Sequence, residues 1–96
     1  MIAVPDPARI ELERLDERWR QLPLDRALRA VPAVRALLQA IADEVAATRG
    51  MPLVPVPDLG PAVVVDQVRV LTFDAVQAGL AEGLAERLAD LRRSLA

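Results

Sequence analysis

Apolar residues near the start of the chain recur at spacings of three and four positions, with charged residues between them. This apolar set is Ala8, Leu12, Leu15, Trp19 and Leu22. Such spacing places the side chains on one face of a helix. Asp6-Pro7 suits a helix start, because Asp accepts hydrogen bonds from free backbone N–H groups and Pro needs no acceptor. Pro23 disfavours helical geometry at the residue before it, so a helix is predicted over 7–21.

A second apolar stripe follows Pro32. Its members are Val34, Leu37, Leu38, Ile41 and Val45. A proline inside a helix costs about 3 kcal/mol, so we expect Pro32 to begin this helix and residues 24–30 to form a separate helical turn. Gly50 is placed to supply the left-handed residue that ends the helix. The pattern therefore predicts a helix over 32–49.

Residues 51–61 contain four prolines and Gly60. This composition excludes a regular helix and favours an extended path. A proline-recognising domain could bind such a segment. However, the segment lies in the middle of the chain, and its larger apolar residues are suited to packing. These residues are Leu53, Val54, Val56 and Leu59. We interpret 51–61 as a stiff connector packed against the helices.

Residues 62–73 fit two structures. They are rich in valine, which favours a strand, yet their spacing also fits a helical stripe. The stripe would contain Val64, Val68 and Leu71. A strand would need a pairing partner, and the nearest candidate, 53–56, lacks a donor at Pro55. A helix is favoured for this reason. The alternative is an α+β fold with a β-hairpin over 53–72 between helices.

The last third of the chain carries a long apolar stripe. It consists of Val76, Leu80, Leu84, Leu88, Leu91 and Leu95. Asp74 and Gln77, just before it, resemble a capping box. On one continuous helix this leucine stripe would lie nearly opposite the face formed by 64–71. We therefore predict helical structure over 61–95, either broken near Asp74 or contacting different partners with its two halves.

Together these elements predict an all-α fold. The expected architecture is a small helical bundle with helices near 7–21, 32–49 and 61–95 and a proline-rich connector at 51–61. A chain of 96 residues is long enough for one hydrophobic core and too short for two. Residues 1–96 are therefore expected to form a single helical domain.

The side chains that most enzymes use are missing from this sequence. All 12 basic residues are Arg, and Lys, His, Cys, Tyr and Asn do not occur. The sequence therefore excludes Schiff bases, histidine general bases, thiolates, disulfides and the usual zinc ligands. We predict no enzymatic activity, no cofactor and no metal.

Carboxylates are the remaining side chains that could support catalysis or bind a metal ion. Glu82, Glu86 and Asp90 would share one face of the last helix. Together with Glu13 and Glu17 on a facing helix, they could hold Mg²⁺. That arrangement would suit a Mg-dependent, all-α phosphohydrolase-like enzyme. A solvated helix face opposite the leucine stripe is the simpler interpretation.

Charge and targeting patterns limit the classes of partner and the cellular location that we expect. The formal net charge is −2, with both signs interleaved along the chain. A nucleic-acid surface needs concentrated positive charge, so nucleic-acid binding is not expected. A small dimeric transcriptional regulator or antitoxin-like protein would have to gather Arg26, Arg29 and Arg35 on one face. No signal-peptide pattern or uncharged apolar span occurs, which predicts a cytoplasmic protein without a membrane segment.

Hydrophobic residues make up 53% of the chain, a larger share than ordinary for a globular domain. We therefore expect a non-enzymatic protein–protein interaction or self-association module that acts through apolar helix faces. The partner would be a larger protein or a second copy, in a homodimer packed through the leucine stripe. The expected interface residues are Trp19, Leu80, Leu84, Leu88 and Leu91. For Trp19, packing in the core is the alternative.

Overall fold

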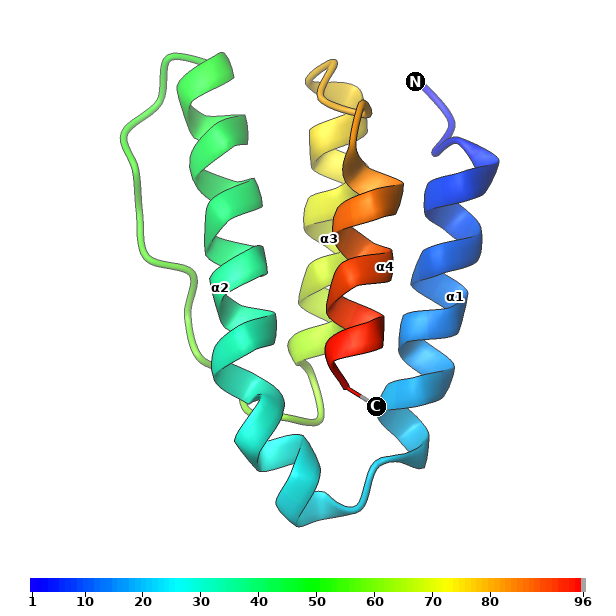
Figure 1. Ribbon diagram of the computed structural model, residues 1–96. Helices are drawn as coiled ribbons and strands as arrows, with labels where there is room; N and C mark the ends of the chain where they lie inside the picture. Colours follow the sequence, from blue (N-terminus) through cyan, green and yellow to red (C-terminus); the bar gives the residue numbers. More distant parts are fainter. Residues whose placement is uncertain (96) are drawn as a thin grey trace.

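Residues 1–95, the part of the chain that the computed structural model describes, form four helices and no strand (Figure 1). The helices are α1 (Asp6–Gln21), α2 (Leu24–Thr48), α3 (Val64–Gln77) and α4 (Leu84–Ser94). The predicted all-α bundle is confirmed, and the alternative with a β-hairpin over 53–72 is wrong. The hairpin does not form because most of its second half is helical, while its first half runs beside α2.

The order of the helices in space requires one long connection. In Figure 1, α1 and α4 run downward, whereas α2 and α3 run upward. The closest helix pairs are α1 with α4 and α2 with α3. Because α2 and α3 are parallel, the chain must return along the whole bundle between them. Residues 49–63 make this return in an extended conformation, as some bundles with crossover connections do.

All four helices contribute side chains to one core. Leu15, Leu38, Ile41, Leu84 and Leu88 are among the largest buried side chains. The valine-rich face of α3 supplies Val64, Val68 and Val76. Thr72 is the buried polar residue of α3, and its hydroxyl donates to the Val68 carbonyl at 2.8 Å. That bond satisfies the hydroxyl inside an otherwise apolar interior.

Pro32 lies inside α2, so the prediction that it begins a separate helix is wrong. The segment over 24–30 and the main helix are continuous, and α2 bends in its lower part (Figure 1). Pro32 itself is exposed, which lets its ring point away from the core. Burial of Ala27 and partial burial of Ala30 hold the first turns against the bundle and offset the lost backbone hydrogen bond.

The break between the last two helices lies at 78–83 and not near Asp74. Asp74 lies within the last turn of α3, so it does not cap a following helix. Gly79 and Gly83 adopt left-handed conformations, with φ of +81° and +80°. These angles suit glycine because no Cβ is present to clash. The break reverses the chain, so the two opposed stripes predicted for 61–95 face the same core.

The other helix ends agree with the sequence pattern in part. Gly50 follows α2 with φ of +66°, which confirms its predicted role in ending that helix. Asp6 is the first residue of α1 and does not cap it; its carboxylate contacts Arg9 at 3.5 Å. Among residues 1–95, no helix combines the length and hydrophobicity needed to cross a bilayer.

Candidate interaction surface on α3 and the connector

The predicted leucine interface is part of the core. Leu84, Leu88 and Leu91 are at most 7% exposed, and Leu80 packs half-buried against the same cluster. Leu80 lies in the 78–83 turn and not on a helix. A dimer packed through this stripe would have to open the core of each copy. The stripe therefore packs within the single chain, where it stabilises the fold.

Trp19 is half-buried and packs against the core cluster from α1. Its indole Nε1 donates to the carbonyl of Pro61 at 2.9 Å. Buried indole nitrogens usually find such a partner. Trp19 thus attaches the end of the connector to α1 and packs against the same core cluster that contains Leu84, Leu88 and Leu91.

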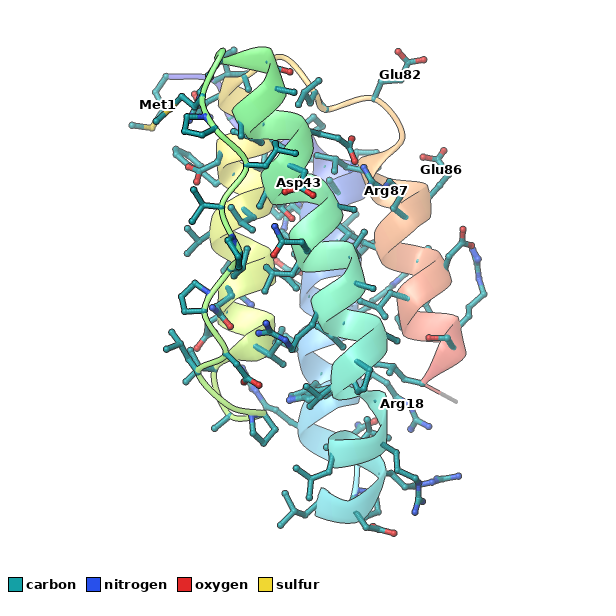
Figure 2. The ribbon with its side chains drawn as sticks, turned by 90° about the vertical axis from the view of Figure 1, so that its left-hand side faces the viewer. Met1, Arg18, Asp43, Glu82, Glu86 and Arg87 are labelled. Atoms are coloured by element: carbon teal, nitrogen blue, oxygen red, sulfur yellow. The ribbon has the colours of Figure 1, made fainter. Side chains whose placement is uncertain are left out.

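The carboxylates considered for Mg²⁺ do not form the expected row. Glu82 lies in the turn before α4, so it is outside the helix that was to carry it. Figure 2 shows Glu82 and Glu86 pointing away from the bundle. Asp90 pairs with Arg93 at 2.8 Å, and Glu13 with Arg9 at 3.0 Å. Within residues 1–95, no group of three or more metal-binding side chains gathers.

Two of the three arginines considered for nucleic-acid binding, Arg29 and Arg35, have partners within the chain. Arg35 Nη2 donates to the carbonyl of Val56 at 3.1 Å, and Nη1 to that of Pro57 at 3.4 Å. Arg29 contacts Asp25 at 3.4 Å. Because the Arg35 guanidinium is hydrogen-bonded to the connector, it does not form a phosphate-binding surface together with Arg26 and Arg29.

Glu11 on α1 is a largely enclosed carboxylate, with a side chain 12% exposed. It accepts from Arg92 Nε of α4 at 3.0 Å and from Arg14 Nη1 at 2.9 Å. Burial raises the pKa of Glu11, but the hydrogen bonds and charges of Arg92 and Arg14 together lower it by more. The net pKa lies below its ordinary value of 4.5. Glu11 therefore acts as a structural link between α1 and α4.

The connector is fixed between α2 and α3 by side-chain amides and a guanidinium. Gln39 Nε2 donates to the Val54 carbonyl at 3.1 Å, and the Val56 N–H donates to Gln39 Oε1 at 2.8 Å. Gln67 Nε2 donates to the Pro57 carbonyl at 3.0 Å. These bonds hold the backbone of 54–57 in an extended path over the seam between α2 and α3, as Figure 2 shows.

The side chains of the connector mostly face solvent. Leu53 and Val54 are 61% and 63% exposed, and Leu59 is exposed as well. The prediction that these residues pack against the helices is therefore wrong, and Val56 alone of the four is partly buried against the core. Hydrogen bonds between the connector backbone and the side chains of Arg35, Gln39 and Gln67 hold the connector in place, and burial of its own side chains contributes little.

An apolar groove lies between the connector and α3. Its volume is about 470 Å³. The lining residues are Val54, Pro55, Val56, Pro57, Val63, Asp66, Gln67, Val70 and Leu71. Val70, at the centre of the outward face of α3, is 60% exposed, and Phe73, one turn further on, is 37% exposed. We define the α3–connector surface as Val54, Pro55, Val63, Val70, Leu71 and Phe73.

One polar atom at this groove has no partner among the described residues. Gln67 Oε1 is buried without a hydrogen bond, while the same side chain donates from Nε2 to the connector. A buried acceptor without a partner costs about 1–3 kcal/mol. The attachment of the connector to α3 is thus less well satisfied than its attachment to α2.

The sequence contains a signal for this surface outside the buried apolar stripes. Val63, Val70 and Phe73 repeat at spacings of seven and three on the side of α3 opposite its buried valines. A helix that is apolar all round has two faces to cover. One face lies in the core, and the other is the α3–connector surface.

Comparison with protein-family models, with curated proteins and with solved structures finds no match for this chain. A proposal about function therefore depends on the geometry of the molecule itself.

Proposed function

We propose that the protein works without catalysis, by binding a protein partner through the α3–connector surface. The observation that carries the proposal is the exposure of Val54, Val70 and Phe73 beside one apolar groove. Isolated apolar residues on a surface are ordinary, but a contiguous patch that includes a groove is typical of an interaction site. The leucine stripe no longer supports this proposal, because it is covered by the chain's own helices.

The arrangement of the groove favours binding energetically. Full burial of an exposed valine contributes about 1.5–3 kcal/mol relative to leaving it in water. The wall formed by 54–57 is already ordered by Gln39, Arg35 and Gln67. A partner would therefore bind a preformed site and would not have to order a loop, which reduces the entropic cost of association.

Photo-crosslinking in cells that make the protein tests this proposal. A photoreactive residue placed at Val70 is expected to give a covalent adduct with a protein partner. The matched control is the same residue at Leu28, which is 52% exposed on α2 and outside the groove. Adducts at position 70 but not at 28 support the proposal. Equal or absent labelling at the two positions contradicts it.

A further inference from the structure

We propose that the partner is a second copy of the chain, with the two α3 helices side by side and parallel about a two-fold axis. This inference rests on the proposed function and specifies it. It follows from the spacing, shape and charge of the outward face of α3.

The outward face of α3 has the spacing of a short coiled-coil seam. Val63 and Val70 are seven residues apart, and Phe73 lies three residues beyond Val70. In a heptad, these are two a positions and a d position, which meet the same positions of a facing helix. Val70 and Phe73 are the exposed centre of this seam. A second α3 therefore fits the spacing.

The shape of the surface selects a parallel pair. The connector forms a wall along the flank of α3 that carries Gln67 and Leu71. The opposite flank faces α1, where Arg69 contacts Asp16 at 3.5 Å. A two-fold axis parallel to α3 brings the connector flank of one copy against the α1 flank of the other. An axis perpendicular to α3 would instead bring the two connectors against each other and hold the helices apart.

The charges on the two flanks select the same arrangement. Arg69 lies on the flank that faces α1, and Asp74 lies five residues later on the connector flank. In a parallel pair these are the g and e positions, which form ion pairs between helices. Two Arg69–Asp74 pairs would therefore cross the interface. A perpendicular axis would instead bring each flank against its own kind, Arg69 toward Arg69 and Asp74 toward Asp74.

The available area fits a weak dimer. The six side chains of the α3–connector surface offer on the order of 300–500 Å² of apolar area. A stable interface buries roughly 800 Å² per partner, and weak ones bury less. Asp66 lies one turn before Val70 on the same seam, so two copies would bring like charges together there. We therefore expect a dimer dissociation constant of about 1–100 µM. The two α3 helices should cross near Val70 and Phe73.

Sedimentation equilibrium of the full chain tests the dimer. The wild type is expected to show a monomer–dimer equilibrium in this range. Val70→Asp should weaken dimerisation at least about tenfold, because it places a charge at the seam. Leu28→Asp is the control and should leave the equilibrium unchanged. Circular dichroism should show full helicity for both variants, since both positions are exposed.

Charge reversal tests the parallel arrangement itself. Arg69→Asp and Asp74→Arg should each weaken dimerisation, because each places like charges opposite one another. An equimolar mixture of the two variants should form a heterodimer about tenfold tighter than either variant alone, since both pairs regain opposite charges. Asp66→Asn should tighten the wild-type dimer. A mixture that binds no more tightly than the single variants would overturn the parallel pair.

The outcomes for the dimer and for the proposed function are separable. If the wild type stays monomeric up to about 500 µM while position 70 crosslinks to a different protein, the second copy is wrong and the interaction function stands. If position 70 gives no specific adduct and the chain stays monomeric, both are wrong. An adduct at twice the mass of the chain, 10.4 kDa per copy, supports both.

Discussion

Glutamine side chains attach the extended segments of this chain to its helices. Gln39 bonds both Val54 and Val56 of the connector, and Gln77 bonds the N–H and the carbonyl of Ile2. An amide can donate and accept at once, so it pairs with an extended backbone as a neighbouring strand would. Proline-rich segments have few N–H groups of their own, which makes such side-chain partners necessary.

Gln39→Ala tests this attachment. The substitution removes both amide bonds to the connector and should lower the free energy of unfolding by about 1–3 kcal/mol. Gln39→Glu should also destabilise the protein, because a carboxylate cannot donate to Val54 and would face the carboxylate of Asp43, to which Gln39 Nε2 donates at 2.8 Å. Urea unfolding followed by circular dichroism measures both. Gln21→Ala is the control, since the Gln21 side chain donates a hydrogen bond to the exposed Glu17 of its own helix and does not contact the connector. Equal effects at 39 and 21 would refute the role given to Gln39.

Glu11 gives the fold a predicted dependence on pH. Its pKa in the folded chain is below the ordinary value of 4.5, so its stabilising effect is complete above that value. The effect is lost as the pH falls through the lower, folded pKa. Wild type should exceed Glu11→Gln in unfolding free energy by about 1–2 kcal/mol at neutral pH. The difference should shrink below about pH 4. Urea unfolding across this range would show a constant difference if the ion pairs were unimportant.

At the level of secondary-structure elements, α2 contains an interior proline whose replacement is expected to stabilise the helix. Pro32 removes one backbone hydrogen bond from the interior of the helix, and its ring is exposed. Pro32→Ala should therefore stabilise the protein by about 1–3 kcal/mol. Pro23→Ala, at the start of α2 where proline fits, should be neutral or slightly destabilising. Thermal unfolding measures both. A loss of stability in Pro32→Ala would mean that the bend itself is needed for packing.

The sequence predicted the faces of the helices better than their continuity. Leu15, Val34, Leu38 and Leu88 are buried as their spacing indicated, because apolar periodicity reports burial directly. Pro32 does not end the helix, because the cost of a single proline is smaller than the free energy that packing of the first turns of α2 recovers. The candidate site was missed for a related reason. A stripe does not reveal whether the chain itself or a partner covers it, and here the chain covers the leucines.

For the whole molecule, ion pairs connect the helices, and the groove beside α3 is an apolar feature that they leave uncovered. Glu11 joins α1 to α4, and Glu44 joins α2 to α4 through Arg87 at 2.9 Å. Asp16 joins α1 to α3 through Arg69. The more exposed pairs, those of Glu44 and Asp16, contribute about 0–1 kcal/mol each, so they orient the helices more than they stabilise them. Folding therefore depends on the core, and association depends on the separate face of α3.

This separation predicts that folding and association can be changed independently. Leu88 is fully buried, so Leu88→Ala should lower the free energy of unfolding by about 2–5 kcal/mol. The same variant should leave the dimer dissociation constant of the folded protein unchanged, because Leu88 lies away from the α3–connector surface. Val70→Asp should do the reverse, weakening the dimer and changing monomer stability by less than about 0.5 kcal/mol. Urea unfolding and sedimentation equilibrium measure the two quantities on the same samples. A Leu88→Ala protein that keeps its helicity yet no longer dimerises would show that the dimer interface includes the leucine stripe.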